Sequence, residues 1–175
     1  SPDAVVQRFS TAAKHTSLDI EVLGASDVAR AGMGLLAGLG AGSEHGPRLL
    51  IVSHGDGSSP VVLIGKGVLM DTGGYNLKRE GISDMSYDKA GGTAVLGAML
   101  AADALRISLP IVAIVPLVEN SIDARAMRPG DVLTAMDGTS VFIGNTDAEG
   151  RLALADSMVY ARRFEPRAIV DIASL

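Results

Sequence analysis

Acidic and basic side chains lie in three segments of the sequence, within or after an apolar run or before a predicted helix. Lys66 and Asp71 lie in VVLIGKGVLMDTGGYNLK, Asp88 lies in SYDKAGG, and Asp147 and Glu149 lie in IGNTDAEGRLALAD. If these segments meet in the fold, four carboxylates share one crevice and repel one another unless cations neutralise them. Two divalent ions would do so, and oxygen ligands with one amine favour Zn²⁺, Mn²⁺ or Mg²⁺. The pattern therefore predicts metal-assisted hydrolysis.

Lys66 is the most informative of these residues, because its primary amine interrupts an otherwise apolar run. Burying an unpaired ammonium group costs several kcal/mol, so the amine should pair with a carboxylate or give its lone pair to a metal ion. The alternative is a lysine on an edge strand, with its side chain extended into water.

The acids also have simpler interpretations when each is taken alone. Asp88 stands before a predicted helix, where an aspartate commonly acts as the N-cap. Asp147 and Glu149 stand at the start of another predicted helix, as a cap and an acid of the first turn. Only the combination with Lys66 favours a metal site.

A calcium-binding loop is a rival interpretation of the last segment. Asn145, Asp147, Glu149, Gly150 and Asp156 occupy positions 1, 3, 5, 6 and 12 of an EF-hand loop. An EF-hand needs a helix before its loop, whereas TSVFIG is typical of a strand, and position 12 would be Asp rather than Glu. No histidine is coupled to a candidate Ser and Asp, and no nucleotide-binding glycine motif follows a strand.

Strands and helices alternate along the chain, which predicts an α/β fold with a mixed central sheet between two layers of helices. Metal ligands would then lie at strand ends. Helices are predicted near residues 2–13, 89–106 and 149–164, with a short helix capped by Ser26 and a loop over the glycine-rich residues 32–46. Strands are predicted for LDIEVLG, RLLIVSH, VVLIGKGVLM, PIVAIVPLV and a buried AIVDIASL, and a hairpin turns at Asp137-Gly138.

Composition narrows the class of protein further. The chain has 175 residues, 47% of them hydrophobic, and a formal net charge of −5, so it can form one core. No cluster of Lys or Arg predicts binding to nucleic acid or to a membrane surface. The absence of Cys excludes disulfides and zinc–thiolate sites, and together with the lack of a signal-like N-terminal segment it favours the cytoplasm.

Three motifs resemble the leucyl aminopeptidase family, the M17 metallopeptidases. NTDAEGRLALAD looks like the family signature, and GKGVLMDTGGYNLK and MSYDKAGGTAVLGAM resemble the two metal-binding segments that precede it. VDIASL resembles the strand that follows. The resemblance runs through essentially the whole chain, and it implies release of N-terminal amino acids, leucine-like and others, from peptides.

The resemblance also implies a role for each acidic residue. Lys66, Asp71, Asp88 and Glu149 would hold a tightly bound metal ion. Asp71, Asp147 and Glu149 would hold a second, more exchangeable ion, with Asp147 also using its main-chain carbonyl. Asp71 and Glu149 would therefore bridge the two ions, which would be Zn²⁺ or Mn²⁺, or else Mg²⁺.

Two basic residues would complete the chemistry in such an enzyme. Lys78 would polarise the scissile carbonyl or its developing oxyanion, and Arg151 would hold a bicarbonate anion that shuttles the proton. A water or hydroxide that bridges the metals would be the nucleophile. Lys89 departs from the family pattern, because it places a positive charge directly after Asp88.

The same resemblance makes residues 1–175 the N-terminal portion of a catalytic domain, with the family's smaller N-terminal domain and the rest of the catalytic domain outside this sequence. We therefore expect a second chain that completes the domain, and a homo-hexamer of the completed unit. The alternatives are a catalytically silent relative that acts as a structural or regulatory subunit and, less favoured, the calcium-binding module.

Overall fold

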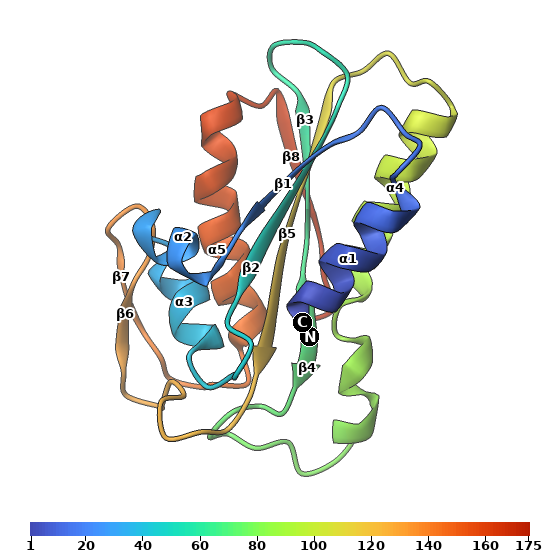
Figure 1. The fold of residues 1–175 in the computed structure, drawn as a ribbon. Coiled ribbons are helices and arrows are strands. Elements are labelled where there is room, and N and C mark those ends of the chain that lie inside the picture. Colours follow the sequence, from blue (N-terminus) through green and yellow to red (C-terminus); the bar gives the residue numbers. More distant parts are fainter.

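A mixed six-stranded sheet forms the centre of the molecule and fixes where the polar strand ends lie (Figure 1). The computed structural model describes residues 1–175. The sheet has the order β1-β2-β5-β3-β8, and β4 pairs with β5 further along the strand than β3 does. Its strands are β1 (Asp19–Leu23), β2 (Arg48–His54), β3 (Val61–Gly65), β4 (Gly67–Asp71), β5 (Ile111–Asn120) and β8 (Ala168–Ile172). Strand β2 is antiparallel to both β1 and β5, whereas β3 and β4 are parallel to β5 and β8 is parallel to β3, so the predicted mixed sheet is confirmed.

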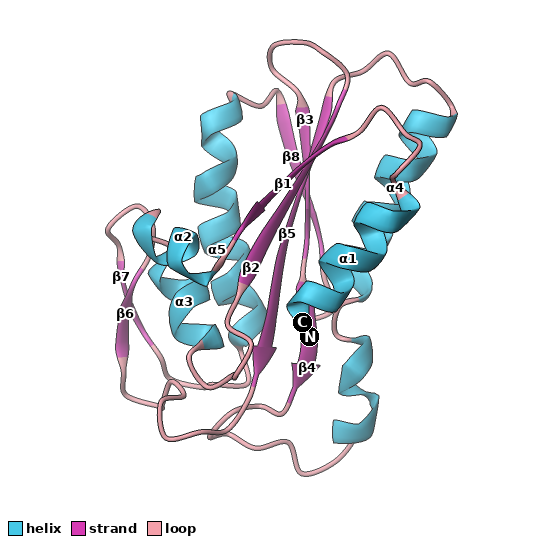
Figure 2. Ribbon diagram, in the orientation of Figure 1, coloured by secondary structure: helices cyan, strands magenta, loops and turns pink.

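Helices cover both faces of this sheet and give the predicted three-layer α/β/α architecture (Figure 2). One layer contains α1 (Pro2–Ala12) and α4 (Ala90–Ala104), and the other contains α2 (Ala25–Arg30), α3 (Gly34–Gly40) and α5 (Glu149–Ala161). Short 3₁₀ helices, η1 (Ile82–Tyr87) and η2 (Arg162–Phe164), precede α4 and follow α5. None of the helices combines the length and the apolar character needed to cross a membrane.

The central strands are buried on both faces, as their apolar sequences predict. In β2, Leu49 and Ile51 pack with the α3 and α5 side chains, while Leu50 and Val52 pack on the opposite face against α1 and α4. Fully burying a Leu, Ile or Val side chain contributes about 1.5–3 kcal/mol to the free energy of folding. The strand ends are therefore held by a rigid core and not by loops alone.

The prediction of a loop over the glycine-rich segment 32–46 is wrong in its middle part, since residues Gly34–Gly40 form α3, whereas residues 41–46 are irregular as predicted. Leu35 and Leu36 are buried in the core, and their backbone N–H groups donate to the Asp156 carboxylate at 2.9 and 3.0 Å. A Cβ atom on Gly38 would lie 2.6 Å from a Leu133 methyl carbon, so the glycine permits close packing. Tertiary contacts thus outweigh the low helix propensity of glycine.

Two further local predictions were wrong. Gly24, not Ser26, is the N-cap of α2, and its N–H donates to the Asp27 carboxylate at 3.1 Å. The run VVLIGKGVLM is two strands rather than one, because the chain breaks at Lys66 between β3 and β4. The Lys66 N–H donates to the carbonyl of Ile172 at 3.2 Å, and the Lys66 carbonyl accepts from the Gly92 N–H at 2.6 Å.

Strand β8 forms as predicted but is exposed rather than buried. It is an edge strand that pairs only with β3, and the exposed fractions of Ile169, Val170 and Ile172 are 39%, 47% and 41%. The apolar sequence of this strand is typical of a strand covered on both faces, but no further strand lies beyond it in the sheet.

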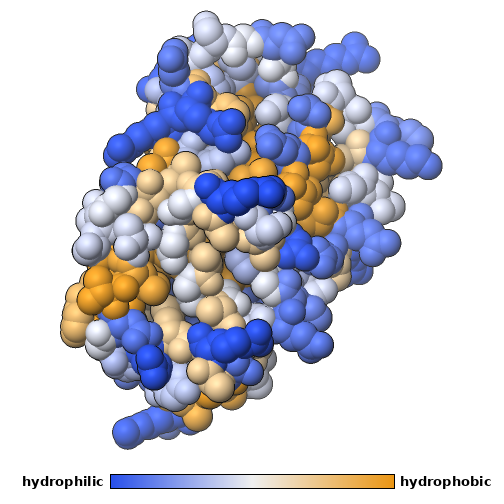
Figure 3. Space-filling model, turned by 60° about the vertical axis from the view of Figure 1, so that its left-hand side comes forward, coloured by the Kyte–Doolittle hydropathy of each residue, from blue (hydrophilic) through white to orange (hydrophobic).

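The hairpin predicted at Asp137-Gly138 is confirmed as β6 (Val132–Thr134) and β7 (Ser140–Phe142). It lies outside α3, and its cross-strand partners Val132 and Phe142 are exposed. On the face shown in Figure 3, apolar residues form separate patches between hydrophilic ones.

Candidate metal centre

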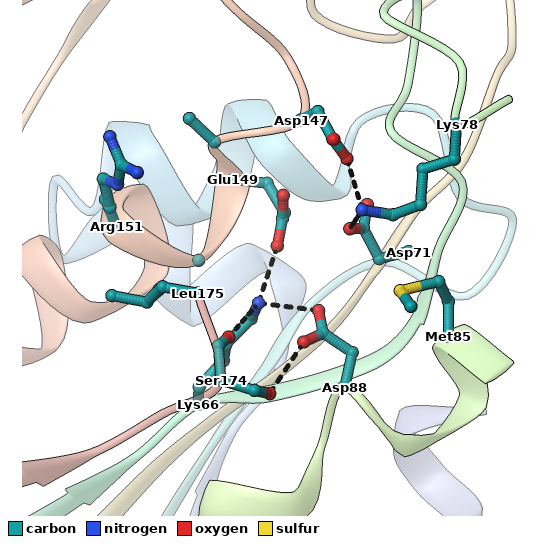
Figure 4. Close-up of a pocket in the computed structure, with 12 residues that line it drawn as sticks. Lys66, Asp71, Lys78, Met85, Asp88, Asp147, Glu149, Arg151, Ser174 and Leu175 are labelled. Carbon is teal, nitrogen blue, oxygen red and sulfur yellow. Dashed lines mark hydrogen bonds and ion pairs between the residues drawn. The ribbon is translucent and has the colours of Figure 1, made fainter. Parts of the chain in front are cut away.

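A polar cavity of about 210 Å³ lies where β4 ends and α5 begins. It brings together all five predicted metal ligands with Lys78 and Arg151, although these residues come from three separate segments of the sequence (Figure 4). The lining residues are Lys66, Asp71, Lys78, Met85, Asp88, Asp147, Ala148, Glu149, Gly150, Arg151, Ser174 and Leu175. The predicted convergence of four carboxylates is thus present in the structure.

Lys66 lies at the floor of the cavity and is only 3% exposed. Its Nζ is 2.7 Å from Asp88 Oδ2 and 2.9 Å from Glu149 Oε1, and it donates to the Ser174 carbonyl at 2.7 Å. The edge-strand interpretation of this lysine is therefore wrong. The break between β3 and β4 lets its side chain reach Asp88 and Glu149, which come from two other segments.

Lys78 joins the other two acids. Its Nζ is 2.8 Å from Asp71 Oδ2 and 2.6 Å from Asp147 Oδ1. A tight turn makes this possible, because Gly73 and Gly74 both adopt positive φ angles, of 85° and 63°. A Cβ atom on Gly73 would lie 3.1 Å from Asp147 Oδ1, so glycine allows the backbone to approach that carboxylate.

The N-cap interpretations of the acids are not supported. Helix α4 has Lys89 as its N-cap, and Asp88 instead pairs with Lys66. Helix α5 has Ala148 as its N-cap, so Asp147 is not the cap, whereas Glu149 does lie in the first turn, as its simpler interpretation predicted. These carboxylates are turned into the cavity (Figure 4).

Burial and neighbouring charges shift the pKa values of two side chains in the cavity. Burial alone would lower the pKa of Lys78, but hydrogen bonds and attraction to Asp147 and Asp71 outweigh it and raise that pKa well above its ordinary value. Burial raises the pKa of Glu149, its bond to Lys66 opposes the shift, and the charge on Asp71 adds to it. Lys78 is therefore cationic at neutral pH, while Glu149 is costly to keep ionised.

The donor set fits divalent metal ions. Oxygens of Asp71, Asp147 and Glu149 lie within 4.8 Å of one another. With Asp88, the cavity holds four carboxylates against the two ammonium groups of Lys66 and Lys78, which leaves a formal excess of negative charge. Asp88 Oδ2 and Asp147 Oδ1 are buried and have only these ammonium groups as partners. Cations that bind carboxylate oxygens would remove the excess.

Arg151 and Lys89 lie apart from the carboxylates. Arg151, on the first turn of α5, is exposed, makes no ion pair and points away from Lys66 and Lys78 (Figure 4). Lys89 donates to the Ser86 carbonyl and lines the groove between α1 and α4. Its charge is therefore directed away from the cavity despite its position after Asp88.

The EF-hand interpretation is contradicted by the backbone. Strand β7 precedes the loop, helix α5 begins at Glu149, and Asp156 is turned away to accept the N–H groups of Leu35, Leu36 and Met136. None of the three histidines lines the cavity.

Three polar residues that support the cavity were missed in the sequence. Asn120 donates to Asp71 Oδ1 at 2.8 Å, Ser174 Oγ donates to Asp88 Oδ1 at 3.0 Å, and Thr146 Oγ1 donates to the Gly73 carbonyl at 2.6 Å. Asn120 and Ser174 each end an apolar run, and a polar residue in that position is the signal that could have found them. Their partners are 49 and 86 residues away, which no local pattern reveals.

Comparison with known proteins gives the same family from sequence and from structure. Residues 1–175 match the model of the cytosol aminopeptidase family, catalytic domain. The chain is 47% identical over 167 residues to a probable cytosol aminopeptidase of Xylella fastidiosa strain M23, covering 94% of this chain and 34% of the relative. It is 45% identical over 179 residues to the corresponding protein of Syntrophotalea carbinolica, covering all of this chain and 36% of the relative.

Two solved structures share the fold over the whole chain. The leucine aminopeptidase of Caenorhabditis elegans superposes with a TM-score of 0.95 at 34% identity, and this chain covers 37% of it. The bottromycin maturation enzyme BotP gives a TM-score of 0.92 at 36% identity, with 38% of it covered. The chain thus spans about a third of the length of the relatives that it matches. It belongs to the cytosol aminopeptidase family of M17 peptidases, and its residues match that family's catalytic domain.

Proposed function

We propose that the protein carrying this chain is a two-metal aminopeptidase that removes N-terminal amino acids, leucine-like and others, from peptides. The observation that carries the proposal is the convergence of Asp71, Asp147 and Glu149 within 4.8 Å, beside the buried pair of Lys66 and Asp88. One ion would be held by Lys66, Asp71, Asp88 and Glu149, and the other by Asp71, Asp147 and Glu149. Zn²⁺ and Mn²⁺ suit this mixed nitrogen and oxygen donor set, and Mg²⁺ would suit the all-oxygen part.

The metal ions and the other charged groups of the cavity would stabilise the reacting carbonyl and bind the substrate. Bound divalent ions would supply Lewis acidity to the carbonyl and lower the pKa of water. Lys78, whose raised pKa keeps it cationic, would stabilise negative charge on the carbonyl oxygen of the scissile bond. The excess negative charge of the cavity would attract the free α-amino group of a peptide, which favours cleavage next to the N-terminus.

Arg151 would hold a bicarbonate anion at the rim. Its exposed guanidinium group has no carboxylate partner and lies on the first turn of α5, where the helix dipole also favours an anion. A guanidinium group cannot itself act as a base, so the bound anion would move the proton.

Replacing Arg151 should separate chemistry from metal binding. We expect Arg151→Ala to keep its metal ions while kcat falls by roughly 10²-fold or more, as when a proton-transfer group is lost. Steady-state kinetics and metal analysis of the purified variant measure the two effects. Arg162→Ala, an exposed arginine of η2 outside the cavity, is the matched control and should behave as wild type. Loss of metal with an unchanged kcat would contradict the proposed role.

Dependence on a free α-amino group tests the proposed reaction. Leucine anilide should be hydrolysed, whereas N-acetyl-leucine anilide should react at least roughly 10²-fold more slowly, because its acylated nitrogen is no longer a cation and cannot be positioned in the acidic cavity. Release of aniline from both substrates by the same preparation gives the ratio. Equal rates would exclude an aminopeptidase, and no reaction in a metal-loaded protein would favour the silent relative.

The proposal extends to the whole protein. We place residues 1–175 in the N-terminal portion of its catalytic domain, a part that a further segment or chain completes, within a cytoplasmic homo-hexamer. Support comes from the match of all 175 residues to the family's catalytic domain, and from relatives named cytosol aminopeptidases that are about three times as long.

A further inference from the structure

Asn120 occupies a central position behind the cavity, at the end of β5. It is 2% exposed and pairs in register with Asp71 of β4. That register depends on a β-bulge between Val68 and Met70, which inserts one additional residue into β4. Without the bulge, the side chain of Asp71 would turn to the other face of the sheet. The bulge therefore brings the two side chains together.

Both hydrogens of the Asn120 amide are used. Nδ2 donates to Asp71 Oδ1 at 2.8 Å and to the carbonyl of Thr146 at 3.0 Å. Asp71 Oδ1 also accepts the N–H of Gly73 at 2.9 Å. These two donors occupy Oδ1 and leave Oδ2 turned to the cavity, where it meets Lys78. Asn120 thus determines which carboxylate oxygen of Asp71 is presented.

The second bond of the amide holds a different segment. Thr146 is fully buried and directly precedes Asp147, so fixing its carbonyl fixes the start of the loop that carries Asp147 and Glu149. One side chain therefore ties together the two segments that supply the three carboxylates lying within 4.8 Å of one another.

We infer that Asn120 is a positioning residue that sets the geometry of the metal site formed by Asp71, Asp147 and Glu149. This inference rests on the proposed function. Groups that hydrogen-bond to metal ligands typically change metal affinity by about 10–100-fold when they are replaced. The other ion would share Asp71 and Glu149 but would also have Lys66 and Asp88, which make no hydrogen bond with Asn120, so its binding should be less affected.

The test is Mn²⁺ binding to Asn120→Asp, measured by calorimetric titration and by electron paramagnetic resonance. The new carboxylate has the size of the amide but offers no donor, and it would face two acceptors, Asp71 Oδ1 and the Thr146 carbonyl. We expect the weaker site to lose roughly 100-fold in affinity and the tighter site at most about tenfold. The spectrum should change from that of a coupled Mn²⁺ pair to that of a single ion.

A second, uncharged variant shows whether an effect of Asn120→Asp comes from the lost hydrogen bonds or from misfolding. The Ser side chain of Asn120→Ser is too short to make both hydrogen bonds and adds no charge. We expect about tenfold weaker Mn²⁺ binding at the same site. Asp156→Asn is the matched control, because it exchanges a carboxylate and an amide at a fully buried position away from the cavity. It should leave both Mn²⁺ affinities unchanged, whatever its effect on the melting temperature.

The outcomes separate the inference from the proposed function. Two Mn²⁺ ions bound with wild-type affinities by both Asn120 variants would overturn the inference and leave the proposed function intact. Equal weakening of both sites, or the same weakening in Asp156→Asn, would also overturn it, since either result indicates a general loss of structure. A wild-type protein that binds no Mn²⁺ would overturn both.

Discussion

Lys66→Arg is expected to lose the tightly held metal ion and to reduce kcat by roughly 10³-fold or more, which corresponds to several kcal/mol of lost transition-state stabilisation. Arginine keeps the positive charge but has no lone pair to give to a metal. If Lys66 served only as a counter-ion for Asp88 and Glu149, a guanidinium group would still neutralise both carboxylates. Metal content after dialysis and the hydrolysis rate together measure the effect.

A control is needed because Lys66 is closely packed. A Cβ atom on Gly150 would lie 2.9 Å from Lys66 Nζ, so little space surrounds the amine. Circular dichroism and thermal melting should therefore show that Lys66→Arg is folded, and Lys14→Arg, at an exposed position after α1, should match wild type in every assay. A folded Lys66→Arg protein with full activity and two bound metal ions would exclude Lys66 as a ligand.

Glu149→Gln is expected to release both metal ions and to lower activity by roughly 10³-fold or more, because Glu149 would be a ligand of both ions in the proposed site. The metal-free variant should nevertheless be at least as stable as metal-free wild type at neutral pH. Burial raises the pKa of Glu149, so its ionised form costs stability in the folded state, and Gln resembles the protonated form.

The pH dependence of the free energy of unfolding tests whether ionised Glu149 destabilises the metal-free protein. A carboxyl group whose pKa is raised by folding costs stability when it is ionised and loses that cost when it is protonated. The stability of metal-free wild type should therefore rise relative to that of Glu149→Gln as the pH falls through the raised pKa. Urea unfolding at several pH values measures the difference. Glu44→Gln, at an exposed position outside the cavity, should show no such dependence. A metal-free Glu149→Gln protein that is much less stable than wild type would show that Glu149 mainly supports the fold.

Most of the fold followed from apolar periodicity, because strands buried on both faces leave a strong local pattern. RLLIVSH and PIVAIVPLV lie in the centre of the sheet, as predicted. The errors arose where long-range contacts decide the local structure. Helix α3 forms despite three glycines in Gly34–Gly40, since it packs on β6 and α5 and its first N–H groups are held by Asp156. No local rule includes a carboxylate located 121 residues away.

The charged residues that line the cavity were easier to predict from the sequence than the residues that hold them in place. The acids were found because charged residues at the ends of apolar segments meet at one edge of an α/β sheet, and because their motifs resemble a known family. The cost of burying an ammonium group predicted that Lys66 pairs with a carboxylate or a metal ion, but it did not identify Asp88 and Glu149 as the partners. Asn120 was missed because its role depends on a β-bulge in a neighbouring strand, which shifts the register by one residue.

Counting bound metal ions tests the central claim most directly. The full-length protein, loaded with Zn²⁺ or Mn²⁺, dialysed and analysed by elemental mass spectrometry, should retain two ions per chain, because four carboxylates and Lys66 line one cavity. One of the two should exchange faster, since Asp147 is more exposed than the buried Asp88. Two ions per chain, with Zn²⁺ or Mn²⁺ retained in preference to Ca²⁺, is the predicted result. A single ion, no ion or a preference for Ca²⁺ would contradict the two-metal account.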